Sequence, residues 1–152
     1  MKSQDPSPCD AIRAPEEEST PMEIVTVRPT EEVMSKQRLP YFFGVSEETS
    51  GARGISMSLV VIPPGGAAEP HYHRGFETAI YMLEGSVETR YGKGLRQRVT
   101  HRPGDFLFIP PGVPHQPVNL SEREPARAIV ARNNPSTNEE VVFYDPDSEN
   151  RA

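Results

Sequence analysis

Gly65-Gly66-Ala67-Ala68-Glu69-Pro70-His71-Tyr72-His73-Arg74-Gly75-Phe76-Glu77, continued to Gly85, is the stretch that decides the fold of this 152-residue chain. A second stretch also has glycine and proline residues on both sides of a histidine. It reads Gly104-Asp105-Phe106-Leu107-Phe108-Ile109-Pro110-Pro111-Gly112-Val113-Pro114-His115-Gln116-Pro117-Val118-Asn119. The chain has four histidines, and three of them lie in these two stretches. A functional site is therefore expected where the two stretches meet.

The spacing of the histidines predicts a metal site. His71 and His73 are two residues apart, so their side chains point to the same face of a β-strand. Glu77 shares that face if the strand runs unbroken, and His115 joins them only if the chain folds back. Three imidazoles and one carboxylate suit one divalent transition metal per chain, with iron, manganese or nickel favoured and zinc or cobalt as alternatives. An octahedral shell would keep two positions for water, substrate or dioxygen.

The two stretches resemble the paired motifs of the cupin superfamily. The first motif is Gly, five residues, His-x-His, three or four residues, Glu, six residues and Gly. The second is Gly, five residues, Pro-x-Gly, two residues, His, three residues and Asn, and Gly104, Pro110, Gly112, His115 and Asn119 match it throughout. The resemblance covers about residues 40–132. It implies four metal ligands: His71, His73, Glu77 and His115.

One departure from the first motif concerns the carboxylate. Seven residues, rather than six, separate Glu77 from Gly85, so counting back six residues places Thr78 in the glutamate position. A one-residue β-bulge after Glu77 is the favoured explanation, because bulges occur at barrel rims and near active sites. In the alternative, Thr78 faces the metal and only the three histidines bind it. The phrase from Glu77 to Gly85 also resembles a largely uncharacterised, bacterial-type group of small RmlC-like monocupins.

The composition indicates one soluble, cytoplasmic domain. The length suits a single core, and the net charge of −6 argues against binding to nucleic acid. Cys9 is the only cysteine, so no internal disulfide is possible. The N-terminus lacks the apolar region of a signal peptide, and the longest apolar run, around residues 59–62, is too short to cross a membrane.

Many short strands separated by turn signals predict an all-β fold. The resemblance implies its form, a double-stranded β-helix (jelly-roll) barrel with short terminal arms. The proline-rich residues 1–22 are expected to be a flexible arm, residues 23–144 a single barrel domain with its core at 40–132, and residues 145–152 a polar tail. Strands are expected at residues 24–28, 39–45, 55–62, 69–91 (a hairpin turning at Gly85), 95–100, 106–109, 115–118, 126–132 and 139–144. Residues 30–36 are expected to form a helical turn, and residues 47–51 a loop.

Three classes of function fit such a site. The favoured one is a dioxygenase or other oxygenase that acts on an enolisable or catecholic small molecule chelated to the metal. In that reading Glu77 doubles as the catalytic base, and Tyr81 is a second catalytic candidate. The second class is a metal-assisted isomerase, epimerase or lyase, in which Tyr72, Tyr81 or His101 moves a proton. The third is a binding protein without turnover.

Two further expectations concern His101 and assembly. His101 lies outside both motifs, and an exposed turn position is the favoured reading over a proton shuttle. Small cupins commonly pair through terminal strands, so a homodimer is expected through residues 23–45 and 139–144. Because histidine must be neutral to bind a metal, metal affinity is expected to fall as the pH drops through about 6.5.

Overall fold

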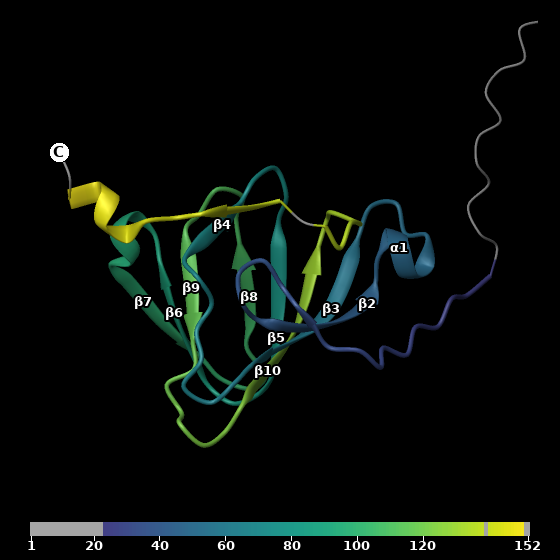
Figure 1. Cartoon of the computed structure of the whole chain (residues 1–152), viewed down its shortest axis with the longest axis horizontal. Helices are drawn as coiled ribbons and strands as arrows, with labels where there is room; N and C mark the ends of the chain where they lie inside the picture. Colours follow the sequence, from purple (N-terminus) through teal and green to yellow (C-terminus); the bar gives the residue numbers. More distant parts are fainter. Residues whose placement is uncertain (1–22, 139, 151–152) are drawn as a thin grey trace, which may run out of the picture.

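Two antiparallel sheets face each other and enclose the site region (Figure 1). The computed structural model describes residues 23–138 and 140–150. Sheet A has the strand order β1-β2-β3-β10-β5-β8, and sheet B has the order β11-β4-β9-β6-β7. The strands are β1 (Val33–Met34), β2 (Pro40–Val45), β3 (Ser56–Ile62), β4 (His71–His73), β5 (Thr78–Glu84), β6 (Val87–Tyr91), β7 (Gln97–His101), β8 (Phe106–Ile109), β9 (His115–Val118), β10 (Ala126–Arg132) and β11 (Val141–Phe143).

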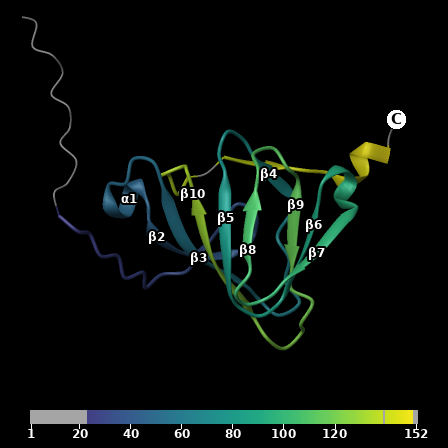
Figure 2. The ribbon, with the colours of Figure 1, turned by 180° about the vertical axis from the view of Figure 1, so that it is seen from behind.

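The chain crosses repeatedly between the two sheets. From β4 onward it runs from sheet B to sheet A at β5, back to B for β6 and β7, to A at β8, to B at β9 and to A at β10. Figure 2, seen from behind, shows β5 and β8 side by side with β9 and β6 beyond them. This arrangement is a jelly roll, and it confirms the all-β cupin-type fold predicted from the sequence.

The core lies between the sheets and follows the two-residue alternation of the strands. Inward side chains of β3 and β10, such as Val60, Ile62, Ala128 and Val130, are buried. Met82 of β5 and Val87 of β6 complete the contact between the two layers. Each valine, isoleucine or methionine side chain that leaves water in this way contributes about 1.5–3 kcal/mol, so this alternation fixes the register of every central strand.

Three local predictions are wrong. Residues 24–28 form no strand, because no described strand pairs with them, and Ile24 is 97% exposed. Residues 30–36 contain the short strand β1 in place of a helical turn. Residues 47–51 hold a short helix, α1 (Glu47–Ser50), which Ser46 caps in a capping box before the chain ends it at Gly51.

The ends of the chain carry the remaining short elements. Two 3₁₀ helices, η1 (Lys93–Leu95) and η2 (Pro146–Asn150), pack against each other near the C-terminus. The predicted arm at residues 1–22, with Cys9, lies outside the described residues. Within the described part of the chain, no helix is long and apolar enough to cross a membrane.

The loop between β4 and β5 decides which side chains reach the site. The sequence prediction ran one strand through His71, His73 and Glu77, but β4 ends at His73 and the chain turns at Gly75, where φ is +73°. β5 then begins in the other sheet at Thr78. The register shift expected after Glu77 occurs near the far end of β5, between Met82 and Glu84.

Candidate metal centre

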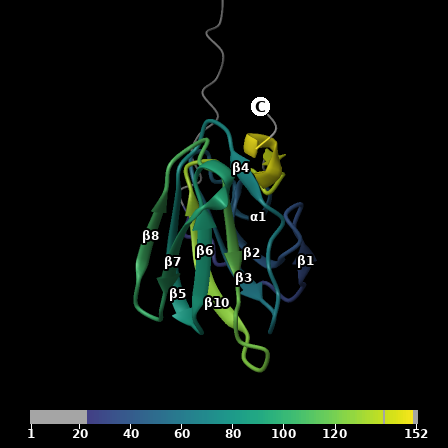
Figure 3. The ribbon, with the colours of Figure 1, turned by 90° about the vertical axis from the view of Figure 1, so that its left-hand side faces the viewer.

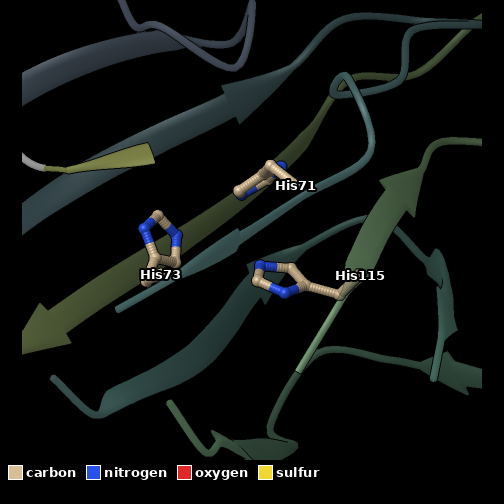
Figure 4. Close-up of side chains that lie close together, drawn as sticks. All are labelled: His71, His73 and His115. Carbon is tan, nitrogen blue, oxygen red and sulfur yellow. The ribbon is translucent and has the colours of Figure 1, made fainter. Parts of the chain in front are cut away.

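Three histidines from two neighbouring strands converge between the sheets (Figure 4). His71 and His73 lie on β4, and His115 opens β9, where it pairs directly with His71. Each offers a ring nitrogen, and the three nitrogens lie within 4.8 Å of one another. The side chains are buried, with 2%, 3% and 6% of their surfaces exposed. The predicted meeting of the two motifs is therefore observed.

Backbone carbonyls orient the three rings. The Nδ1 atom of His71 lies 2.6 Å from the carbonyl oxygen of Glu69, and that of His115 lies 2.9 Å from the carbonyl oxygen of Val113. The Nδ1 atom of His73 is 3.4 Å from the carbonyl oxygen of Glu140. A carbonyl can only accept, so each contact places the proton on Nδ1 and leaves the Nε2 lone pair for a ligand.

The surroundings keep the rings neutral. Burial and the neighbouring His115 lower the pKa of His71 to about 3. Burial and the charge of Arg132 lower the pKa of His73 to about 2. Burial also lowers the pKa of His115. Neutral imidazoles are the form that a transition metal binds, and one nitrogen of each ring lies within 4.8 Å of the others, so the donor set fits such an ion.

Glu77 does not join the histidines in this structure. Its side chain is exposed, and its backbone N–H donates to Oδ1 of Asn133 at 2.7 Å. Thr78 occupies the inward position instead and is 2% exposed. This position of Thr78 matches the alternative given in the sequence analysis, in which Thr78 faces the metal and only the three histidines bind it. The cause is the turn at Gly75, which breaks the parity on which the carboxylate depended.

The two tyrosines considered as proton carriers also point elsewhere. Tyr81 lies on the outer face of sheet A, where its ring centroid is 4.7 Å from that of Phe106. Tyr72 lies between the two ligating positions of β4, and its ring contacts the guanidinium of Arg74 at 5.9 Å. Strand alternation explains both positions, because each tyrosine is adjacent in its strand to a residue that points inward and therefore points outward itself.

A pocket of about 410 Å³ leads to His115. It opens where β7, the edge of sheet B, faces β8, the edge of sheet A; Figure 3 shows these strands at one side of the molecule. Most of its lining is apolar: Val99, Phe106, Leu107, Phe108, Ile109, Pro110 and Val113. The polar groups are few, as in most small-molecule sites.

His101 is part of this pocket, although the sequence favoured an exposed turn position for it. It ends β7 and is half-buried, and its Nδ1 lies 3.1 Å from Oγ1 of Thr89. Burial lowers its pKa. With Nδ1 held by Thr89, Nε2 is the nitrogen left for a ligand. His101 is thus a second polar position of the pocket, separate from the three histidines.

Arg132 is a buried residue near the site that the sequence analysis missed. It is 9% exposed, and its Nε donates to Oγ1 of Thr78 at 3.3 Å. One of its terminal nitrogens donates to the hydroxyl of Tyr41 at 3.4 Å. A signal was present, because Arg132 shares the inward parity of Ala128 and Val130 in β10.

Comparisons with known proteins agree with this geometry. A family model described as a cupin domain matches residues 58–132. Germin-like protein subfamily T member 3 of Arabidopsis thaliana is 38% identical over 79 residues, which is 47% of this chain and 32% of that protein. The match thus spans about a third of that relative's length.

Solved structures share the fold at low sequence identity. The polyketide cyclase RemF from Streptomyces resistomycificus matches with a TM-score of 0.66 and 22% identity, over 84% of this chain and 91% of that chain. An oxalate oxidase matches with a TM-score of 0.59 and 24% identity, over 72% of this chain and 56% of that chain. With its jelly-roll sheets and both motifs in place, this chain belongs to the cupin superfamily.

Proposed function

We propose that this protein is a metal-dependent enzyme, an oxygenase acting on an enolisable or catecholic small molecule. The observation that carries the proposal is a cluster of three buried, neutral histidines at the end of a largely apolar pocket. Structural metal sites are closed by four protein ligands, whereas three histidines leave positions for a substrate. A divalent transition metal held there would supply Lewis acidity and bring substrate and dioxygen together.

The residues of the chain supply the remaining functions. Carbonyls of Glu69 and Val113 hold two of the ligating rings in one orientation. The apolar walls exclude water from a substrate and favour a planar or aromatic body. His101, held by Thr89, is placed to accept or return a proton at the pocket. We assign this role to His101 rather than to Glu77 or Tyr81, because His101 lines the pocket and the other two do not.

A second candidate is a metal-assisted isomerase, epimerase or lyase. His101 is the observation that favours it, because such reactions need a proton acceptor beside a polarised carbonyl and need no dioxygen. A binding protein without turnover is the third. We also propose that the protein is cytoplasmic and forms a homodimer, as the sequence predicts.

Metal content of single variants tests the site itself. His73→Ala should lose the metal, because one of three donors disappears, whereas His101→Ala should retain it. Glu77→Gln should also retain it if three histidines suffice. Elemental analysis of the purified variants measures all three. Full occupancy in His73→Ala would refute the histidine site, and loss in Glu77→Gln would restore the carboxylate as a ligand.

Oxygen consumption separates the functional classes. Wild-type protein loaded in turn with iron, manganese and nickel should consume dioxygen when one member of a panel of catechols and β-diketones is added. His73→Ala serves as the control for reaction by free metal. Metal retention with turnover that continues without dioxygen would favour the isomerase class. Metal retention without turnover of any compound would favour the binding protein.

A further inference from the structure

A tyrosine that the sequence analysis did not single out stands beside the metal ligands. In sheet B, His115 pairs directly with His71 of β4 on one side and with Tyr91 of β6 on the other. Side chains directly opposite one another in a sheet share a face, with Cβ atoms about 4.5–5.5 Å apart. Because the two histidines point inward, Tyr91 points inward beside them. It is therefore placed to act at the site, whereas Tyr72 and Tyr81 are not.

The hydroxyl of Tyr91 is available to a ligand. The side chain is half-buried and lines the same pocket as His115. Tyr144, which is also half-buried, uses its hydroxyl within the protein and accepts the backbone N–H of Gly94 at 2.7 Å. Among the described residues, none forms a hydrogen bond with the Tyr91 hydroxyl. This group can therefore donate to a molecule that enters the pocket.

The two walls of the pocket differ in chemistry. One wall belongs to sheet B, whose strands β9, β6 and β7 lie side by side in Figure 2. Apart from Val99, the side chains that line this wall are polar: Thr89, Tyr91, His101 and His115. The opposite wall is apolar and consists of β8 with Pro110 and Val113. A ligand there turns its oxygen or nitrogen atoms toward sheet B and its apolar face toward β8.

The polar wall is longer than a metal site alone requires. His115 lies in the row of Tyr91, whereas His101 pairs with Val87, four residues along β6. At about 3.3 Å per residue, these two rows are about 13 Å apart. Nδ1 of His101 lies 3.1 Å from Oγ1 of Thr89, in the row between them. The hydrogen-bonding groups at the two ends of the wall are thus separated by more than one aromatic ring can span.

We propose that Tyr91 and His101 recognise the two ends of an elongated aromatic substrate. The Tyr91 hydroxyl donates to an oxygen at the chelating end, and His101 forms a hydrogen bond with a polar group at the far end. This inference rests on the proposed function, because His115 is one of the ligands of the metal that holds the chelating end. It goes further in two respects: it selects molecules of two or more rings over single-ring compounds, and it makes Tyr91 a residue that touches the substrate.

A matched pair of probes tests both ends of the pocket. The first probe is a phenylcatechol whose second ring is attached para to one hydroxyl, and the second probe adds a hydroxyl at the far end of that ring. Full-length, nickel-loaded protein would be titrated with each probe by isothermal titration calorimetry without dioxygen, so that no turnover intervenes. Wild type should bind the second probe roughly three- to tenfold more tightly, because the added hydroxyl gains a hydrogen bond with His101.

Three variants assign the two contacts. His101→Leu should bind both probes with equal affinity, because the far hydroxyl loses its partner. Tyr91→Phe should weaken both probes by the same factor, about tenfold, because it lacks the donor to their common end. Tyr81→Phe removes a hydroxyl from the outer face of sheet A and is the matched control, so it should bind both probes as wild type does. Circular dichroism melts and nickel content establish that each variant is folded and loaded.

The outcomes separate this inference from the proposed function. A wild type that binds neither probe would overturn both. A wild type that binds the two probes equally would leave the proposed function standing and overturn recognition of the far end. Unchanged affinity of folded, nickel-loaded Tyr91→Phe for both probes would overturn the contact at the chelating end.

Discussion

Asn119 shows at the scale of one residue why the second motif ends as it does. Its side chain is 2% exposed, and its Nδ2 donates to the carbonyl oxygens of Ile62 at 3.1 Å and of Glu124 at 2.8 Å. Its Oδ1 accepts the backbone N–H of Ser121 at 3.1 Å. The amide thus joins the end of β3 to the loop before β10, and its role is structural rather than catalytic.

Removal of this amide should therefore lower stability and leave the metal site intact. Asn119→Ala leaves buried carbonyls without a donor, so we expect a loss of about 2–3 kcal/mol in the free energy of unfolding. Urea unfolding measures it. Asn138→Ala is the control, because its exposed side chain accepts from Lys36 at 3.0 Å, and it should change stability by less than about 0.5 kcal/mol. Equal losses in the two variants would contradict this account.

At the scale of elements, the turn between β5 and β6 is held against β10. Gly85 has φ of +77°, and a Cβ there would lie 2.8 Å from Cα of Ala126 and from the carbonyl oxygen of Pro125. Gly112 has the same φ, but a Cβ there would meet nothing within 4 Å. The two glycines therefore separate backbone strain from a steric clash.

Alanine at each position should give different losses of stability. Gly112→Ala meets only the positive φ of the backbone, at about 1 kcal/mol. Gly85→Ala adds a collision with the backbone of β10, so about 3 kcal/mol is expected. Thermal melts of both variants at one protein concentration measure the difference. Similar melting temperatures would mean that β10 moves aside at little cost.

The same elements explain what the sequence could and could not predict. The alternation of apolar residues in β3 and β10 predicted strands, because a strand's burial pattern repeats every two residues. The spacing of the two motifs predicted the cluster of three histidines. Glu77 was predicted to follow that periodicity if the strand ran unbroken, and the strand ends before it, at His73. Its position depends on where β4 ends, which the turn at Gly75 and the change of sheet decide. The alternation of β10 predicts that Arg132 faces inward, but its contacts with Thr78 and Tyr41 depend on which strands pair in sheet A, which no local pattern reports.

At the scale of the whole molecule, the three histidines couple folding to pH. In the folded, metal-free chain, burial holds the pKa of His71 at about 3 and also lowers the pKa values of His73 and His115. In the unfolded chain these groups titrate near about 6.5. Below that pH the unfolded chain takes up protons that the folded chain does not, so the stability they contribute is complete above about 6.5 and decreases as the pH falls toward the folded values.

This coupling revises the expectation for metal affinity. Because the folded site is already neutral well below pH 6.5, metal affinity of the folded chain should change little between pH 7 and about 5.5, and the loss on further acidification should accompany unfolding. Free energies of unfolding of the metal-free protein, measured in urea from pH 7.5 to 5.5, should fall below pH 6.5 with a slope of up to about 1.4 kcal/mol per pH unit for each buried histidine. His115→Gln should reduce that slope by about a third, and the half-buried His101→Gln by much less. An unchanged slope in His115→Gln would mean that its ring is protonated in the folded chain, and a three-histidine metal site could not then form without releasing that proton.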